Sequence, residues 1–245
     1  MYMRILKLLI MSWLERPEQK QKNPAKKFLE WKSEEQCFMF YNKETEQNEK
    51  VELPLNMVII EHYHTVKGWD DKNESSIYSN EVFAIGTDPL TVKSFGSKKA
   101  NTQGRTIGKG LYKDIKNEVK AEGAHYSRSI YAVTSNLELI NISLKGSGVQ
   151  SYSDFVNNVL NGDHNFDKQW VKITGAEERK KGKVTYSVPV FEKGQEIKDK
   201  SKLNPFAKEL QEYMIAYTGD SEKVLNTKVN DAKVVEAEEE EDLPF

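Results

Sequence analysis

Residues 96–110 read GSKKANTQGRTIGKG and hold four glycines and four cations but no acid. Glycine allows a backbone to approach a ligand closely, and cations without neighbouring acids attract an anion. The stretch does not match a nucleotide-binding phosphate loop, because Gln103 stands where the first Gly is required and Gly110 follows Lys109 in place of Ser or Thr. The composition therefore favours an extended polyanion as the ligand.

Residues 111–121 are expected to form a helix, because Leu111, Ile115 and Val119 recur at a four-residue spacing. Lysines follow Lys109 at spacings of four, three and four, so they form one stripe beside the apolar row. The first cationic cluster comprises Lys98, Lys99, Arg105, Lys109, Lys113, Lys116 and Lys120. A lysine stripe also suits a solvated helix face, so the acid-free loop before the helix carries most of the argument.

A second cationic cluster lies in GAEERKKGK, residues 175–183, between the apolar segments 170–174 and 184–191. Those segments are typical of the two arms of a β-hairpin, which places the cations at its turn. The cluster comprises Arg179, Lys180, Lys181 and Lys183. Two basic loops beside a sheet would attract a polyanion onto it.

Aromatic residues make up 10% of the chain and supply flat faces on which the bases of an unpaired strand can stack. Tyr126 and Tyr131 flank Arg128, which interleaves stacking with a cation contact, and these three are the leading candidates. Trp69 and Phe95 come next. The whole candidate set for stacking is Phe40, Trp69, Tyr78, Phe95, Tyr112, Tyr126 and Tyr131. Burial in the core is the alternative for each of them.

Side chains suited to covalent or metal chemistry are few. His62 and His64 would share one face of a strand, but the single cysteine, Cys37, is distant in sequence and cannot pair in a Cys-x-x-Cys motif. Glu178 and Lys180 have the Glu-x-Lys spacing of some metal-dependent nucleases, without a convincing upstream acid on a strand. We therefore predict no catalytic residue, metal ligand or cofactor, and a Mg²⁺-dependent nuclease at Glu178 and Lys180 is the enzymatic alternative.

Residues 236–245, EAEEEEDLPF, contain six carboxylates and no cation. Too little apolar surface and strong self-repulsion predict a disordered arm. The whole chain has a formal net charge of -2, but without this arm 36 bases face 32 acids, which is 38 minus six. A basic body with an acidic arm is expected when the arm competes with an anionic ligand. A solubilising tail is the simpler alternative, although solubility does not require the terminal Phe.

Glu239, Glu240, Glu241 and Asp242, followed by Leu243, Pro244 and Phe245, resemble the acidic tip of bacterial single-stranded DNA-binding proteins. The resemblance covers about seven of the 245 residues. The Gly/Gln/Pro-rich linker of the bacterial proteins is missing here, so bacteriophage single-stranded DNA-binding proteins, which often end in acidic tails, are the closer comparison. The resemblance implies that residues 240–245 bind replication proteins such as a polymerase, primase or helicase.

The elements that must position these residues are mainly short strands separated by turns. Strands are expected at 37–41, 51–66, 77–86, 90–95, 128–134 and 137–144 besides the hairpin, helices at 111–121, 152–160 and 205–217, a helical turn after Asn23-Pro24, and loops at 42–50, 68–76 and 96–110. The predicted fold is mainly β (α+β), an OB-fold-like antiparallel barrel with added helices and a disordered acidic C-terminal tail. This is the commonest fold of single-strand binders.

Three regions are predicted along the chain. Residues 1–20 are an N-terminal extension, with Met11 as an alternative start, residues 21–220 the OB-like binding domain, and residues 221–245 a flexible linker and acidic tail. Lys7 interrupts the apolar run of the extension and no small-residue cleavage site follows it, which argues against a signal peptide. A lone cysteine fits a cytoplasmic protein, in the host cytoplasm if the chain is phage-encoded, with no membrane partner.

Together these observations predict a protein that binds and protects single-stranded DNA without sequence preference during phage DNA replication, recombination and repair. It is expected to act without enzymatic activity and to recruit replication proteins through its tail, with a homodimer as one assembly to test. The alternatives are the nuclease described above and an adaptor whose acidic tail alone binds a host protein.

Overall fold

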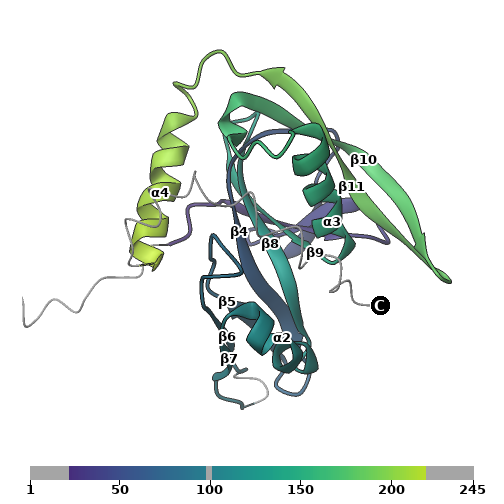
Figure 1. The fold of residues 1–245 in the computed structure, drawn as a ribbon, viewed down its shortest axis with the longest axis vertical. Helices are drawn as coiled ribbons and strands as arrows, with labels where there is room; N and C mark the ends of the chain where they lie inside the picture. Colours follow the sequence, from purple (N-terminus) through teal and green to yellow (C-terminus); the bar gives the residue numbers. More distant parts are fainter. Residues whose placement is uncertain (1–21, 98–100, 219–245) are drawn as a thin grey trace, which may run out of the picture.

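The computed structural model describes residues 22–97 and 101–218, and this part of the chain is mainly β (Figure 1). The strands are β1 (Lys27–Lys32), β2 (Cys37–Asn42), β3 (Gln47–Lys50), β4 (Leu55–Asp70), β5 (Ser75–Ser79), β6 (Leu90–Ser94), β7 (Arg105–Gly110), β8 (Ala124–Thr134), β9 (Leu139–Lys145), β10 (Gln169–Lys181) and β11 (Val184–Glu196). The helices are α2 (Tyr112–Ala121), α3 (Ser147–Asp154), which continues as the π-helical turn η1 (Phe155–Val159), the short 3-10 turn η2 (Phe166–Lys168), and α4 (Asn204–Thr218).

All the described strands belong to one sheet, whose main path runs β3-β2-β1-β9-β8-β4-β5-β6-β7. The hairpin of β10 and β11 pairs through β10 with the start of β4, while β5 pairs with its end. Every strand pair is antiparallel except β1 with β9, which is parallel. The sheet is open, so the predicted OB-like barrel is not confirmed, although the mainly β class is.

The long strands β4 and β8 form the centre of the sheet. β4 is rich in the β-branched and aromatic residues that favour strands, and it pairs with β8 from Met57 to Gly68. Every residue of β8 from Ser127 to Thr134 is buried. A strand covered on both faces accepts such a continuous buried run.

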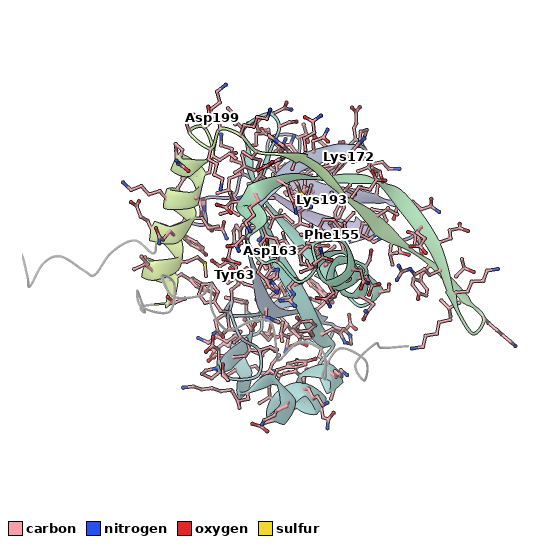
Figure 2. All side chains as sticks on the ribbon, turned by 45° about the horizontal axis from the view of Figure 1, so that its top comes forward. Tyr63, Phe155, Asp163, Lys172, Lys193 and Asp199 are labelled. Carbon is pink, nitrogen blue, oxygen red and sulfur yellow. The ribbon has the colours of Figure 1, made fainter. Side chains whose placement is uncertain are left out.

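The two faces of the sheet carry different helices (Figure 1). Apolar residues of β1, β8 and β9, such as Leu29, Ile130 and Ile142, pack with α3 and η1. On the opposite face, Tyr63 of β4 and Tyr131 of β8 pack against α4. Figure 2 shows Tyr63 on the side of the sheet toward α4 and Phe155 on the side of α3.

Several predicted elements are confirmed by the structure. The helices at 111–121 and 205–217 appear as α2 and α4, and the helix at 152–160 appears as α3 with η1, beginning five residues earlier than expected. The hairpin is present, but its strands are longer than predicted, and only Gly182 and Lys183 separate them. Within the described ranges, no helix is long and apolar enough to span a membrane.

Other elements were predicted wrongly because pairing with distant strands overrides local preference. The expected helical turn at Phe28 and Trp31 is β1, which is held in parallel to β9. The expected loops at 42–50, 68–76 and 96–110 contain β3, the end of β4 and β7. The predicted extension 1–20 and the linker and tail 221–245 lie outside the described residues.

Candidate nucleic-acid interface

The strands β5, β6 and β7 and the end of β4 form one wing of the sheet, and helix α2 covers one of its faces. Ile77, Val92 and Ile107 point to this covered face, where they pack with Ile115 and Val119 of α2. Because side chains alternate along a strand, their sequence neighbours point to the other face, which we call the open face of the wing.

Three aromatic residues are exposed on the open face. Trp69 of β4 is 51% exposed, Tyr78 of β5 43%, and Phe95, directly after β6, 63%. The rings of Tyr78 and Phe95 meet edge to face with centroids 6.0 Å apart. All three line one shallow hollow of about 430 Å³, together with Glu74, Ser75, Ser76, Gly96 and Ser97. We call Trp69, Tyr78 and Phe95 the aromatic surface.

Lysines flank the aromatic surface on the same face. Lys67 of β4 and Lys93 of β6 lie opposite Tyr78 in the strand register, one on each side. Directly opposed side chains in a sheet have Cβ atoms about 4.5–5.5 Å apart. Lys109 of β7 pairs with Thr91 and lies farther along this face. Lys93 and Lys109 are exposed, while Lys67 is half-buried, and this burial lowers the pKa of Lys67 against the opposing effect of Glu81 and Glu30.

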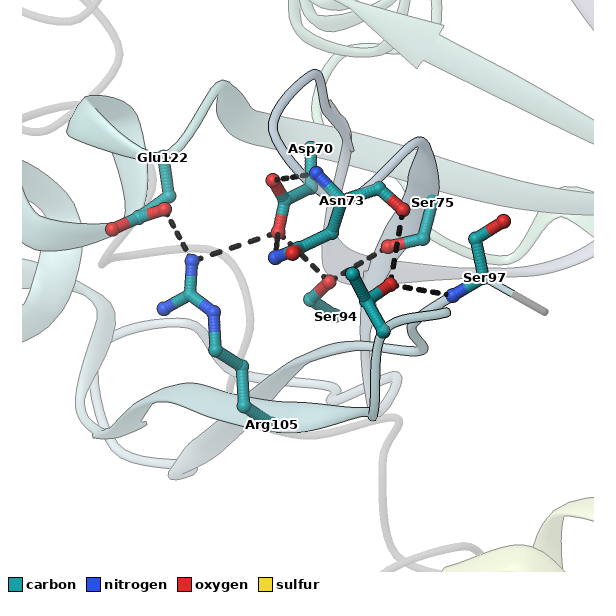
Figure 3. A network of polar contacts seen from close by, with 8 residues as sticks. Asp70, Asn73, Ser75, Ser94, Ser97, Arg105 and Glu122 are labelled. Atoms are coloured by element: carbon teal, nitrogen blue, oxygen red, sulfur yellow. Dashed lines mark hydrogen bonds and ion pairs between the residues drawn. The ribbon is translucent and has the colours of Figure 1, made fainter. Parts of the chain in front are cut away.

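A polar network at the edge of the wing holds the aromatic surface in place (Figure 3). Asp70, which is buried, accepts hydrogen bonds from the backbone N–H of Asn73 at 3.1 Å, the amide of Asn73 at 2.7 Å and the hydroxyl of Ser94 at 2.9 Å. The guanidinium of Arg105 forms ion pairs with Asp70, at 3.5 Å, and with Glu122. Burial opposes the charge of Asp70, but these hydrogen bonds and Arg105 together hold its pKa below the usual value.

The same network closes the base of the loop that follows Phe95. The hydroxyl of Thr102 accepts a hydrogen bond from the N–H of Ser97 at 2.9 Å and donates one to the carbonyl of Asn73 at 3.2 Å. Gly96 has a φ of +70°, and a Cβ there would lie 2.5 Å from the carbonyl oxygen of Thr102, so only glycine fits. Phe95 therefore directly precedes a backbone segment whose position is fixed by these contacts.

The predicted cations of the first cluster are dispersed. Arg105 is occupied by Asp70 and Glu122, and it acts as a brace within the wing. Lys113 and Lys116 lie on α2, which covers the face opposite the aromatic surface. Lys98 and Lys99 lie outside the described residues. Among the described residues of this cluster, Lys109 alone lies on the open face.

Two of the three leading candidates for base stacking, Arg128 and Tyr131, lie in the interior, which corrects their assignment as a DNA contact. Tyr131 is 0% exposed and donates a hydrogen bond to Glu81 at 2.9 Å. Arg128 is 3% exposed and lies opposite His64 in the register of β4 and β8. Tyr126 is partly buried, and its hydroxyl lies 2.6 Å from Nδ1 of His64. At Arg128 and Tyr131, β8 is covered on both faces, so these two side chains have no access to a base.

His64 is held as a neutral imidazole between Arg128 and Tyr126. Nη1 of Arg128 lies 2.7 Å from Nε2 of His64, and since a guanidinium only donates, Nε2 accepts and Nδ1 carries the proton toward Tyr126. On the same strand His62 lies 2.9 Å from the Tyr152 hydroxyl. Burial, followed by the charge of Arg128, lowers the pKa of both histidines well below the ordinary value.

No group of three His, Cys, Asp or Glu side chains within the described residues is arranged to hold a metal. His62 and His64 share a face as predicted, but each is hydrogen-bonded to a different tyrosine. Glu178 is on the exposed hairpin, where it accepts a hydrogen bond from Gln36 at 3.3 Å.

The second predicted cluster lies away from the aromatic surface. Arg179 forms ion pairs with Glu177 at 3.0 Å and Asp154 at 3.7 Å, whereas Lys180 and Lys181 are exposed near the hairpin tip. The hairpin joins β4 at Leu55 to Met57, at the opposite end from Trp69. The tail residues Glu240, Glu241, Asp242, Leu243, Pro244 and Phe245 lie outside the described residues.

Lys67 and Lys93 were missed by sequence reasoning. The sequence pattern that could have revealed them is the alternation of side chains along a strand. Lys67 is two residues before Trp69, and Lys93 is two residues before Phe95, so each lysine shares a face with an exposed ring. Comparison of the chain with protein-family models, curated proteins and solved structures finds no match.

Proposed function

We propose that the protein binds single-stranded DNA without sequence preference, and that the open face of the wing is its contact. The observation that carries the proposal is the aromatic surface, three exposed rings on one side of a sheet whose other side is covered by α2. Lys93 and Lys109 supply exposed cations on the same side, and Lys67 lies half-buried beside Tyr78. Exposed rings beside cations are what a single strand requires, since its bases stack and its phosphates need positive charge.

Stacking explains the absence of sequence preference in this proposal. Every base has a π-face, so an aromatic platform accepts each of them, and a stacked base contributes about 1–3 kcal/mol. The wing plays the part that an OB-like barrel face plays in other single-strand binders, with an open sheet as the platform. Coating and protecting exposed strands during phage DNA replication, recombination and repair is the role that this chemistry fits.

The acidic tail completes the proposal. Its six carboxylates compete with DNA for the cations, and residues 243–245 recruit a polymerase, primase or helicase when DNA displaces the arm. The protein would then act in the host cell cytoplasm.

Alanine substitution of the exposed rings tests the proposal. Trp69→Ala, Tyr78→Ala and Phe95→Ala should each weaken binding of a fluorescently labelled oligothymidylate of about 25 nucleotides by roughly 5- to 150-fold, corresponding to the loss of one stacked base. Fluorescence anisotropy at low salt measures the dissociation constant. Val159→Ala serves as the control, because Val159 is 42% exposed but lies in η1, on the α3 side of the sheet. Equal affinity of all four variants and the wild type would refute this contact surface.

The same mixtures distinguish the alternative functions. Cleavage of the oligonucleotide with Mg²⁺, abolished by Glu178→Ala, would indicate the nuclease. If the anisotropy of the oligonucleotide did not change when the protein was added, and the protein bound a host protein only when its tail was present, the protein would be the adaptor.

A further inference from the structure

A second group of exposed aromatic residues lies at the far end of the sheet, on β1 and β2. Phe28 is 50% exposed and Tyr41 56% exposed. Both line a hollow of about 860 Å³, which also contains Lys26 and Lys43. We call these four residues the Phe28 surface.

The Phe28 surface lies on the same side of the sheet as the aromatic surface, as the strand registers show. Phe28 pairs with Asn141 of β9, Asn141 with Tyr131 of β8, and Tyr131 with Glu61 of β4. Paired residues point to the same face, and from Glu61 every second residue of β4 does so as far as Trp69. One continuous face therefore connects the two surfaces.

Helix α4 covers the middle of this face. Tyr63 and Tyr131 pack there against Leu210, Tyr213 and Met214 of α4. The aromatic surface and the Phe28 surface are thus exposed on either side of the strip that α4 covers. Each of the two must therefore contact a ligand separately.

Cations predominate in the hollow of the Phe28 surface. Its lining includes the lysines Lys22, Lys26, Lys27, Lys32 and Lys43 and the acids Glu30, Glu44 and Glu49. Lys27 is paired with Glu138 at 3.0 Å and Lys32 with Glu30 at 3.1 Å. Lys22, Lys26 and Lys43 are exposed and form no ion pair with another described residue. Exposed rings beside lysines that are not held in ion pairs complement a strand that offers bases and phosphates.

We propose that the Phe28 surface is a second contact for single-stranded DNA, and that one strand bridges it and the aromatic surface around α4. This inference rests on the proposed function. From Glu61 to Trp69 and across three strand spacings, the direct separation is roughly 30 Å. At about 3.4 Å per stacked nucleotide, a strand of roughly nine nucleotides or more is needed to reach both surfaces.

Bridging predicts a dependence on strand length. A strand that occupies one surface has a high effective concentration at the other, so loss of either surface weakens long strands far more than short ones. Phe28→Ala combined with Tyr41→Ala should weaken binding of an oligonucleotide of about 25 nucleotides by roughly tenfold or more, but of about 6 nucleotides by no more than roughly twofold. Trp69→Ala combined with Phe95→Ala should show the same selectivity for length.

The outcomes separate this inference from the proposed function. If the Phe28 and Tyr41 variant binds the long oligonucleotide as the wild type does, while the Trp69 and Phe95 variant does not, the second contact is refuted and the proposed function stands. If neither variant affects any oligonucleotide, the proposed function itself fails. Unchanged DNA affinity with an altered sedimentation coefficient would instead make the Phe28 surface an interface between two copies, which also refutes the inference.

A charge variant keeps the test valid if removal of the rings impairs folding. Lys26→Glu combined with Lys43→Glu changes two exposed side chains. The double variant should bind the long oligonucleotide roughly tenfold more weakly than the wild type, and the short one with an affinity within roughly twofold of the wild type. An equal effect on both lengths would contradict bridging.

Discussion

At the scale of single residues, the open face depends on side chains that never contact DNA in the proposed complex. Asp70 joins the turn at Asn73, strand β6 through Ser94, and strand β7 through Arg105. Trp69 is its neighbour in sequence, and Phe95 is the neighbour of Ser94. A single buried carboxylate therefore positions two of the three exposed rings.

Asp70→Ala is expected to destabilise the protein, because it leaves the buried Ser94 hydroxyl and the amide of Asn73 without this acceptor. The loss should be about 1–3 kcal/mol in the free energy of unfolding, measured by urea denaturation. The control is Asp71→Ala, because Asp71 is exposed. The free energy of unfolding of this variant should stay within about 0.5 kcal/mol of the wild-type value. Similar stabilities of the two variants would show that the network contributes little.

His62 and His64 make stability depend on pH. Burial and Arg128 lower the pKa of both in the folded protein, whereas in the unfolded chain each titrates near its ordinary value of about 6.5. Below that pH the unfolded chain takes up protons that the folded protein does not, so the contribution to stability is complete above about pH 6.5 and is lost as the pH falls.

Each histidine is expected to remove roughly 1 kcal/mol of stability between about pH 6.5 and 5.5. Glu81 acts in the opposite sense, because burial raises its pKa and the folded protein binds its proton more readily at acidic pH. His62→Gln and His64→Gln keep a hydrogen-bonding group that does not titrate. In urea denaturation at several pH values, the free energy of unfolding of these variants should therefore depend less on pH. If the free energy of unfolding of the variants changed with pH as steeply as that of the wild type, the two histidines would not be the source of the pH dependence.

At the scale of elements, the wing requires a very close approach of β4 and β8. Gly68 pairs with Ala124, and a Cβ on Gly68 would lie 2.4 Å from both the Cα of Ala124 and the carbonyl oxygen of Gly123. Gly123 has a φ of +83° and ends the turn after α2. These glycines let the chain pass from the end of α2 directly into β8, beside the end of β4.

Gly68→Ala should therefore force the two strands apart. We expect a loss of about 1–3 kcal/mol or more in stability, as for other overpacked interiors, together with weaker oligonucleotide binding because Trp69 is displaced. The matched control is Gly175→Ala in β10, where an added Cβ meets nothing within 4 Å. Thermal unfolding of both variants provides the measurement, and equal melting temperatures would contradict this packing argument.

At the scale of the whole molecule, charge is divided between the body and the tail. The tail from residue 236 holds six of the 38 acids and none of the 36 bases. In the proposed function, the basic body would bind DNA by releasing counterions, and the acidic arm would compete with DNA for the same cations.

Deletion of residues 236–245 is expected to leave affinity for single-stranded DNA equal or higher, since the competing carboxylates are removed. Titrations at several salt concentrations should give a slope of log K against log salt near -0.7 for each phosphate neutralised, in both proteins. A large loss of affinity on deletion would contradict the tail model, and affinity independent of salt would contradict the electrostatic part of the proposal.

Much of the local structure was predictable from the sequence. The four-residue apolar spacing of α2, the amphipathic segment of α4 and the hairpin around residues 175–183 are properties of neighbouring residues. All three elements are present, although the turn of the hairpin is shorter than predicted. The acidic composition of residues 236–245 was likewise readable without coordinates, as was the presence of Trp69 and Phe95 close to charged residues in the sequence.

The face on which each side chain lies was decided by the tertiary structure. Tyr126, Arg128 and Tyr131 have the composition of a binding strand, but β8 lies at the centre of the sheet with helices on both sides. Arg105 looks like a free cation until the fold brings Asp70, 35 residues away, and Glu122, 17 residues away, against it. Burial and charge compensation depend on contacts between residues distant in sequence, so local pattern alone could not distinguish the exposed rings from the buried ones.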